Sequence, residues 1–249
     1  MSTTVPRTVR VATFNIHHGA DPAGVVDLER TARAIEELDA DVVLLQEVDR
    51  NWQRSGGADQ ATTLAERLGR HHAFGAALEL PAEQRGTGAR EYGQLILSRH
   101  PFSAVGRMPL PSQGRSEPRM LLRADIEIDG TVTTFAVAHL DDADADTRLR
   151  QGEAVLDELA DIEGVVFGGD LNEDADGPAH RLLASVWTDA WRAAGDGPGT
   201  TFLGDDADPE PARLDHLFCS AALRCAGARV AVRAAGVSDH LPLVAEFTR

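Results

Sequence analysis

The sequence predicts an α/β fold in which two stacked, mixed β-sheets carry helices on their outer faces. Strand-like segments outnumber helical ones, and hairpins alternate with helical crossovers, which is typical of mixed sheets. The segment Val42–Leu45 is apolar on both faces, which suits a strand that is covered on both sides. Polar residues that could bind a metal or transfer a proton are spread from position 15 to position 240, so we expect one domain over residues 1–249.

The expected elements of the first half follow from apolar spacing. Thr8–Asn15 is an apolar-rich strand that contains no strand breaker. Asp27–Leu38 is a helix, because its apolar residues recur every three to four positions and its first residue is a suitable N-cap. Asp41–Gln46 is a short strand, a helix lies near Thr62–Leu68, and Gln94–Ser98 is a further strand.

The second half reads in the same way. Met120–Ile128 and Val132–Leu140 are strands joined by Asp129-Gly130, a strong hairpin signal. Thr147–Ala160 has the clearest helical periodicity. The remaining expected strands are Val165–Gly168, Leu214–Cys219, Ala228–Val232 and Leu241–Phe247.

Composition excludes several classes of function. The net charge is −16 and the chain contains no lysine, which excludes Schiff-base chemistry and a phosphate-binding loop that ends in lysine. No apolar run approaches the roughly 18 to 20 residues of a membrane span, and residues 1–7 lack the pattern of a secretion signal. We therefore expect a cytoplasmic monomer in which Cys219 and Cys225 are buried thiols.

Seven short blocks each end a strand-like run with a polar residue. One such block means little, because Asp, Asn and Glu commonly follow strands as turn residues. Together, the blocks give one side of a sheet the carboxylates, amides and imidazoles that are typical of a divalent-metal phosphoesterase site. The blocks are Thr13-Phe14-Asn15, Leu45-Gln46-Glu47, Leu97-Ser98, Ala138-His139-Leu140, Gly169-Asp170-Leu171-Asn172, Leu214-Asp215-His216 and Ser238-Asp239-His240.

In this order, the blocks resemble the endonuclease/exonuclease/phosphatase superfamily, which contains DNase I, neutral sphingomyelinases and inositol polyphosphate 5-phosphatases. The most specific matches are Gly168–Asn172 and Ser238–His240. The resemblance implies a four-layered α/β/β/α sandwich with its site at one edge of the sheets. It also implies a Mg²⁺-dependent hydrolase that cleaves a phosphodiester by in-line attack of water, with Mn²⁺ or Ca²⁺ as alternative cations. It says little about the substrate.

The metal ligands follow from this context. Glu47 is the first expected ligand, because Mg²⁺ is a hard cation that binds one or two carboxylates and keeps several waters. By resemblance, Asp239 also reaches the metal or its water. Asn15 either supplies an amide oxygen to the metal or orients Glu47. The alternative without a function is that Asn15 is a turn residue at the end of its strand.

The remaining blocks supply the expected catalytic groups. Asp170 orients or deprotonates the attacking water. Asn172 lies two residues further, so on an extended backbone it projects to the same face and donates to a phosphate oxygen. By resemblance, His240 contacts the scissile phosphate while Asp215 fixes its tautomer, and His139 donates to another phosphate oxygen. The identity of the general base, Asp170 or His240, stays open at this stage.

Other polar residues have weaker signals. His17 either lines the pocket or binds a second metal together with the histidine that follows it, although satisfied loop histidines are the favoured interpretation. Arg119 clamps a phosphate or pairs with an acid. His216 is expected in the core, because it alternates to the opposite face from Asp215. Tyr92 is expected to be structural or peripheral.

The placement of acids bears on the substrate. Acidic segments adjoin the motif residues, and a negatively charged rim would repel a long polyanion. We therefore favour a small or lipid-like phosphodiester, with a nuclease acting on DNA or RNA as the alternative, and a noncatalytic binding protein as a remote one. The arginine-rich stretch Pro81–Arg123 would offset the rim if it folds over the same edge, and the acids could equally serve solubility or Ca²⁺ binding. The acids are Asp141, Asp142, Asp144, Asp146, Glu173, Asp174, Asp176, Asp205, Asp206, Asp208 and Glu210.

Overall fold

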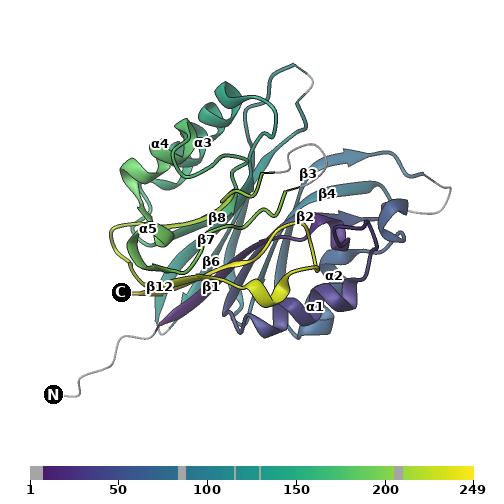
Figure 1. The fold of residues 1–249 in the computed structure, drawn as a ribbon, viewed down its shortest axis with the longest axis horizontal. Helices are drawn as coiled ribbons and strands as arrows, with labels where there is room; N and C mark the ends of the chain where they lie inside the picture. The colour runs from purple at the N-terminus through teal and green to yellow at the C-terminus, as the bar shows by residue number, and fades with distance from the viewer. Residues whose placement is uncertain (1–7, 84–87, 115, 129, 205–209) are drawn as a thin grey trace.

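The computed structural model describes residues 8–83, 88–114, 116–128, 130–204 and 210–249. Two β-sheets are stacked face to face, with α1 and α2 against one outer face and α3 and α4 against the other (Figure 1). The predicted α/β/β/α sandwich is confirmed. Some expectations fall on residues outside the described ranges, namely the segment 1–7, Arg85, Arg115, Asp129, Asp205, Asp206 and Asp208.

Within the described residues, the first sheet has seven strands in the order β10-β12-β13-β1-β2-β4-β3. β1 and β2 run parallel, whereas β4 is antiparallel to β2 and β13 is antiparallel to β1. The strands are β1 (Val9–Asn15), β2 (Val42–Arg50), β3 (His71–Leu80), β4 (Arg90–Ser98), β10 (Gly195–Asp196), β12 (Arg224–Val230) and β13 (Leu243–Thr248).

The second sheet has six described strands in the order β5-β6-β7-β8-β11-β9. β7 and β8 run parallel, and β11 is antiparallel to β8. The parallel pairs bring the carboxyl ends of β1, β2, β7 and β8 to positions where side chains from both sheets can meet. The strands are β5 (Phe102–Pro109), β6 (Met120–Ile128), β7 (Thr131–His139), β8 (Val165–Asp170), β9 (Thr188–Asp189) and β11 (Asp215–Cys219).

The α-helices begin with favourable caps. The carboxylates of Asp27, Asp59, Asp144 and Asp189 accept hydrogen bonds from backbone N–H groups in the first turn of α1, α2, α3 and α5. α4 begins with a proline, which needs no N–H partner there. The helices are α1 (Leu28–Glu37), α2 (Gln60–Leu68), α3 (Ala145–Leu159), α4 (Pro178–Val186) and α5 (Ala190–Ala194), with short 3-10 turns at His17–Gly19, Gln53–Ser55 and Val232–Ala234.

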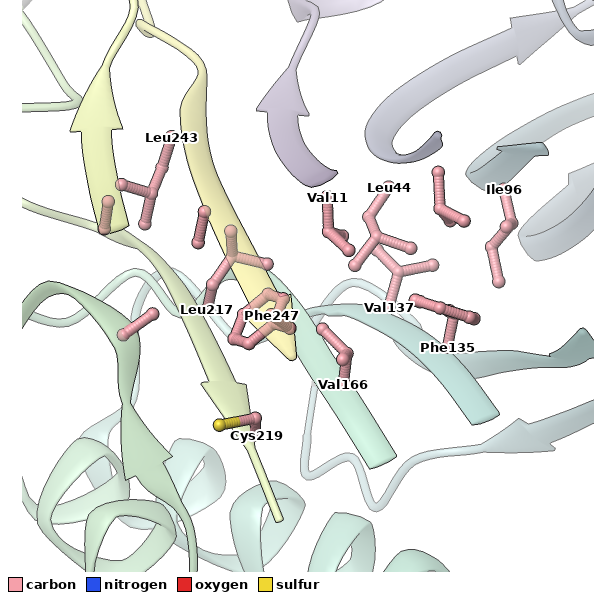
Figure 2. Packing of buried hydrophobic residues seen from close by; sticks show 14 of the residues in the cluster. Val11, Leu44, Ile96, Phe135, Val137, Val166, Leu217, Cys219, Leu243 and Phe247 are labelled. Atoms are coloured by element: carbon pink, nitrogen blue, oxygen red, sulfur yellow. The ribbon is translucent and has the colours of Figure 1, made fainter. Parts of the chain in front are cut away.

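The core lies in three layers, of which the central one fills the space between the sheets (Figure 2). Val42 and Leu44 face this central layer, whereas Val43 and Leu45 face the helices α1 and α2. The prediction that this strand is covered on both sides is confirmed. Each fully buried side chain of this size stabilises the fold by about 1.5–3 kcal/mol. A third apolar layer, which includes Phe167, joins the second sheet to α3 and α4.

One residue that was predicted to join the site, Ser98, lies at the opposite edge of the sheet. Ser98 pairs with Val42, the first residue of β2, because β4 is antiparallel to β2. Ser98 therefore lies at the opposite edge from Glu47, and its hydroxyl accepts a hydrogen bond from the backbone of His100. The expectation that the block ending in Ser98 joins the site is wrong. None of the helices in the described residues is long and apolar enough to cross a bilayer.

Candidate active site

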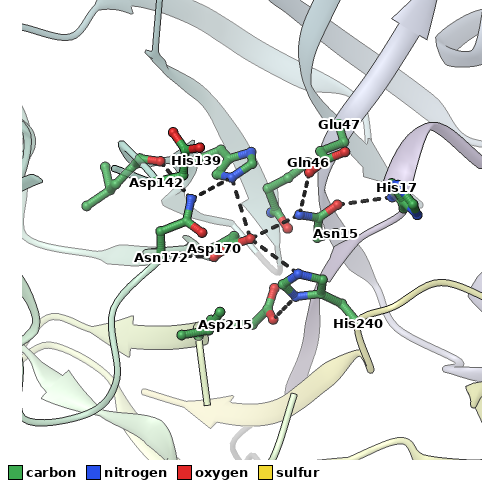
Figure 3. Close-up of polar contacts among 12 residues, drawn as sticks. Asn15, His17, Gln46, Glu47, His139, Asp142, Asp170, Asn172, Asp215 and His240 are labelled. Carbon is green, nitrogen blue, oxygen red and sulfur yellow. Dashed lines mark hydrogen bonds and ion pairs between the residues drawn. The ribbon is translucent and has the colours of Figure 1, made fainter. Parts of the chain in front are cut away.

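Predicted site residues from both sheets converge at one edge (Figure 3). Asn15 is the last residue of β1, His139 ends β7, and Asp170 ends β8. β11 runs antiparallel to β8, so its first residue, Asp215, lies beside the end of β8. His139 and Asp215 are the direct cross-strand partners of Asp170 on its two sides. The sheet register itself therefore places three of the expected side chains next to one another.

A β-bulge sets the position of Glu47. The register of β2 on β4 shifts between Leu45 and Val48, and Glu47 has a φ of 59°, in the left-handed region. Gln46 turns inward, where its amide donates to Thr13 Oγ1 at 3.0 Å. The extra residue frees Glu47 from the normal alternation and directs it to the site. Non-glycine residues rarely adopt this conformation, and such strain is common at functional sites.

Asn15 joins two of the carboxylates. Its Nδ2 donates to Glu47 Oε1 and to Asp170 Oδ2, both at 3.0 Å. Its Oδ1 accepts a hydrogen bond from the backbone N–H of His17 at 3.0 Å. Of the two expected roles of Asn15, this geometry favours the orientation of Glu47. The carboxylates of Glu47 and Asp170 are thereby held on one amide group, so the spread-out sequence blocks do form one pocket.

His240 forms a buried pair with Asp215. Its Nδ1 lies 2.7 Å from Asp215 Oδ2, and its Nε2 lies 3.6 Å from Asp170 Oδ2. Burial by itself lowers the imidazole pKa, but the negative charges of Asp215 and Asp170 outweigh it and raise the pKa of His240 to about 10. Thr201 Oγ1 accepts the backbone N–H of Asp215, which anchors the pair. His240 is therefore an imidazolium at neutral pH.

His139 and Asn172 contact each other on the other side of Asp170. Asn172 Nδ2 lies 2.9 Å from His139 Nε2 and donates to Leu140 O at 3.0 Å. Burial, followed by repulsion from Arg119, lowers the pKa of His139 to about 3, so this imidazole is neutral. Asn172 has a φ of 48°, so the expectation of an extended backbone there is wrong. Its contact with a phosphate oxygen stays a prediction.

Asp239 approaches the site from the chain that leads into β13. Its Oδ1 accepts a hydrogen bond from Ser238 Oγ at 3.0 Å and lies 3.7 Å from His17 Nδ1. His17 lies next to Asp239 but is not among the described residues that line the pocket. The structure therefore places His17 beside an expected metal ligand, while its predicted contact with substrate has no support from this geometry.

The converging residues line a pocket of about 430 Å³. All predicted site residues except Asp215 and His17 contribute to its wall, and Asp215 lies behind His240. The predicted residues in the wall are Asn15, Glu47, Arg119, His139, Asp170, Asn172, Asp239 and His240. The wall also contains Asp142, one of the acids expected to rim the site, and four residues that were not expected there, namely Tyr92, Glu117, Phe202 and Leu214.

Arg119 pairs with acids, which confirms one of its two predicted alternatives, whereas its contact with a phosphate stays a prediction. It lines the pocket, and its Nη1 and Nη2 lie 3.0 Å from Glu117 Oε1 and 3.2 Å from Asp142 Oδ1. Only 4% of its side chain is exposed. Among the described residues, its buried Nε has no hydrogen-bond partner, which leaves a donor for an anionic ligand.

Tyr92 and Glu117 are the most informative residues that the sequence analysis missed. Tyr92 pairs with Asp49 on β2, just beyond the Glu47 bulge, and is buried in the pocket wall rather than peripheral. Tyr92 lies six residues before the end of β4, the strand next to β2, and this position gave no direct signal in the sequence. Glu117 is partly buried, and this burial raises its pKa.

Most of the acids near the motifs do not rim the pocket. Asp141 accepts hydrogen bonds from two backbone N–H groups, and Asp144 caps α3. Glu173 accepts the backbone N–H of His180. Among the acids of these segments that the structure describes, Asp142 lines the pocket. Asp141, Asp144 and Glu173 therefore do not form the expected negative rim, because their carboxylates bind backbone N–H groups, whereas Asp205, Asp206 and Asp208 lie outside the described residues.

The arginine-rich stretch does not cover the site as a block either. Arg119 reaches the pocket, as described above. Arg99 instead pairs with Asp39 and Asp41, close to the opposite edge, and Arg123 pairs with Glu158 on α3. Among the described arginines of this stretch, Arg119 alone lines the pocket. The expected offset of negative charge at the site therefore comes from one guanidinium group.

A second polar cluster lies behind the site. His180 Nε2 is 2.9 Å from Asp189 Oδ2, and His216 packs against His180 with ring centroids 4.7 Å apart. His216 is fully buried, which confirms the prediction that it belongs to the core. Arg213 Nη1 and Arg192 Nε lie 3.4 Å and 3.7 Å from the same Asp189 oxygen. These guanidinium groups already neutralise Asp189, so the cluster is a poor site for a further cation.

Comparison with known proteins agrees with the geometry. Residues 12–240 match the model of the Endonuclease/Exonuclease/phosphatase family. An endonuclease/exonuclease/phosphatase from Beutenbergia cavernae is 27% identical, with a TM-score of 0.77 over 97% of this chain and 72% of that one.

Two more distant structures show the same fold. A mannosyl-6-phosphatase from Bacteroides thetaiotaomicron is 17% identical, with a TM-score of 0.73 over 97% of this chain and 100% of that one. TDP2 from D. rerio, complexed with single strand DNA product, is 19% identical, with a TM-score of 0.72 over 97% and 99% of the two chains. The chain belongs to the endonuclease/exonuclease/phosphatase family of phosphoesterase hydrolases.

Proposed function

We propose that this chain is a Mg²⁺-dependent phosphodiesterase that acts on a small or lipid-like phosphodiester. The observation that carries the proposal is the single amide of Asn15 that holds Glu47 and Asp170 together, with the imidazolium of His240 beside them. This arrangement combines carboxylates for a hard cation with a carboxylate and a cationic donor for a phosphoryl group. The pocket size is in the range of small-ligand sites.

The donor set fits a divalent cation. Burial raises the pKa of the Glu47 carboxyl more than any other influence, and the charge of Asp239 raises it further, so an added cation would favour the ionised form of this carboxyl. Glu47 and Asp239 would hold Mg²⁺, and Mn²⁺ or Ca²⁺ would use the same oxygen ligands. When bound, the cation neutralises charge on the phosphoryl oxygens. Asn15 keeps the Glu47 carboxylate in position for it.

The remaining side chains divide the proton chemistry between them. His240 is already protonated at neutral pH, so it stabilises phosphoryl charge or donates a proton to the leaving oxygen. We therefore assign the role of base to Asp170, whose Oδ2 lies 3.5 Å from His139 Nε2 and 3.6 Å from His240 Nε2. The attacking water would be oriented by this carboxylate. Arg119 would bind an anionic oxygen of the substrate through its free Nε.

Nuclease action remains the second candidate. It is favoured by the shared fold with the TDP2 structure that contains single strand DNA product. Net acidity does not exclude it, because a bound cation and Arg119 supply local positive charge in the pocket. We favour a small substrate because of the dimensions of the pocket and because the acids Glu117 and Asp142 in its wall would repel a polyanion. An acidic rim around the pocket is not needed for this preference.

A substrate panel tests the proposal. Wild type and the variants Glu47→Gln, Asp170→Asn and His240→Ala are assayed on bis-p-nitrophenyl phosphate, sphingomyelin, single-stranded RNA and supercoiled plasmid, each with Mg²⁺, Mn²⁺ or Ca²⁺. We expect each variant to lose at least about 100-fold in rate, because each removes a group that acts in the transition state. Glu29→Gln, on the exposed face of α1, serves as the control and keeps wild-type activity.

Two outcomes would change the conclusion. Equal hydrolysis of bis-p-nitrophenyl phosphate by wild type and His240→Ala would remove the catalytic assignment. Plasmid nicking that exceeds small-substrate hydrolysis, and that is lost in Glu47→Gln, would make the chain a nuclease. Circular dichroism of each variant checks that lost activity does not reflect lost structure.

A further inference from the structure

A column of stacked cationic and aromatic side chains begins at the pocket wall. The guanidinium carbon of Arg54 lies 5.3 Å from the ring centroid of Tyr92 and 4.6 Å from that of Trp52. The guanidinium carbon of Arg90 lies 4.8 Å from the Trp52 ring. We call Tyr92, Arg54, Trp52 and Arg90 the cationic column. Its first member, Tyr92, lines the pocket, so the column extends the site outward.

The sheet order places this column on the opposite side of Glu47 from the catalytic cluster. β2 carries Glu47 and lies between β1, which carries Asn15, and β4, which carries Tyr92. Tyr92 pairs with Asp49, two residues after Glu47. A substrate that has its scissile phosphoryl group near Asp170 and reaches past Glu47 would therefore meet Tyr92 and Arg54.

Arg54 is held in a fixed orientation. Its Nε and Nη2 donate to the two carboxylate oxygens of Asp49, each at 2.8 Å, and Asp49 is fully buried. Ser55 donates to the same carboxylate at 2.9 Å. Because a guanidinium is planar, the edge that carries Nη1 faces away from Asp49. The side chain is 42% exposed, so a donor edge is presented in a preset geometry.

The column also limits what can bind there. The guanidinium groups of Arg54 and Arg90 both lie over the Trp52 ring, so Trp52 is not a free platform for a nucleobase. A guanidinium edge instead matches the planar oxygens of a carboxylate or a phosphate. The charge of Arg54 also acts on the pocket itself, because it lowers the pKa of Glu117 against the larger raising effect of burial.

We propose that Arg54 binds a second anionic group of the substrate, a carboxylate or a phosphate that lies beyond the scissile phosphoryl group. This inference rests on the function proposed above and narrows it to small phosphodiesters that carry an additional negative charge. The competing interpretation is that Arg54 only braces the loop after β2 through Asp49. The two interpretations differ in whether loss of Arg54 affects charged and uncharged substrates unequally.

Matched substrate pairs make this distinction. p-Nitrophenyl phenylphosphonate is compared with its counterparts that carry a carboxylate on the phenyl ring, either directly or through one or two methylene groups. Release of p-nitrophenol gives kcat/KM for wild type, Arg54→Gln, Arg54→Lys and the control Arg67→Gln. Arg67 pairs with Glu29 on the helical layer and is 38% exposed, so it matches Arg54 in exposure and pairing but lies outside the site.

We expect wild type to prefer a carboxylated substrate, and Arg54→Gln to reduce that preference by about tenfold, mainly through KM, as expected for loss of one charge-assisted hydrogen bond. Arg54→Lys should retain part of the preference, because it keeps the charge without the planar fork. Arg67→Gln should leave both rates unchanged.

Other results would overturn the inference. If Arg54→Gln slows both substrates equally, Arg54 is a brace. A parallel pair, p-nitrophenyl thymidine 5′-phosphate with and without a 3′-phosphate, tests the source of the anion. A preference that depends on Arg54 in this pair alone would identify a nucleic-acid strand and refute the small-substrate claim. Failure of wild type to hydrolyse any of these esters with Mg²⁺ would refute the proposed function, and the inference with it.

Discussion

Replacement of Asp215 by Asn should lower the pKa of His240 by about 3. Asp215 Oδ2 lies 2.7 Å from His240 Nδ1, and both side chains are buried. With an effective dielectric constant of about 20, a unit charge about 4 Å away contributes ~4 kcal/mol, which corresponds to about 3 in pKa. The net pKa of His240, about 10 instead of 6.5, also contains the opposing effect of burial and the raising effects of Asp170 and Asp239, which the substitution leaves in place. Asn preserves the shape and a carbonyl acceptor but removes the charge.

The same change predicts a shift in the dependence of stability on pH. The pKa of His240 is higher in the folded chain than in the unfolded one, so its stabilising contribution is complete below about pH 6.5 and is lost as the pH rises towards 10. The contribution is about 3–5 kcal/mol in the free energy of unfolding. Asp215→Asn should remove most of this loss, because its His240 is neutral over most of that range.

NMR titration and urea unfolding measure the two effects. In EDTA-treated protein, the ring resonances of His240, assigned by their absence in His240→Ala, are followed from about pH 5 to pH 10.5, a range that spans both pKa values. Urea unfolding near pH 6.5 and near pH 9.5 gives the difference in free energy. Asp157→Asn, an exposed residue of α3, is the control. A His240 that titrates near 6.5 in wild type, or at the same pH in both proteins, would refute the reasoning.

Three further predictions concern stability. Gly169→Ala should destabilise the fold by about 2–4 kcal/mol in urea unfolding, because its Cβ would lie 1.8 Å from the carbonyl oxygen of Ala138, whereas Gly227→Ala meets nothing within 4 Å and should be nearly neutral. Asp144→Ala should cost about 1 kcal/mol through loss of the α3 cap, measured in the same way. Mg²⁺ added to EDTA-treated protein should raise the unfolding temperature of wild type but not of Glu47→Gln, as followed by circular dichroism.

The strand positions and most of the site could be predicted because both depend on local patterns. Alternating or continuous apolar runs located β1, β2, β6, β7 and β8, and the polar residues that end such runs were placed correctly wherever the strands are parallel. β3 was missed because His71–Leu80 is rich in alanine and contains a glycine, so it lacks the β-branched residues that indicate a strand. Ser98 was misplaced because strand direction depends on the topology of the whole sheet.

The other differences between the predicted and the observed site arise from backbone conformation, helix N-caps and loop paths. The left-handed conformation of Asn172 changes the direction of its side chain without any change in spacing. The acids at 141 and 144 suggested a charged rim, although the spacing of Asp144 and Thr147 is also the pattern of a helix N-cap. Tyr92 and Glu117 enter the pocket through pairing and loop paths that a single sequence does not encode locally.

The bulge in β2 makes the site sensitive to chain length. It adds one residue relative to β4, so a single-codon deletion at Gln46 would restore a regular ladder without disturbing the pairing of either flank. The Glu47 carboxylate would then take the place of Gln46, between the two sheets and beside Thr13. Relatives that have lost hydrolysis through such a deletion would keep the sandwich and every other motif intact.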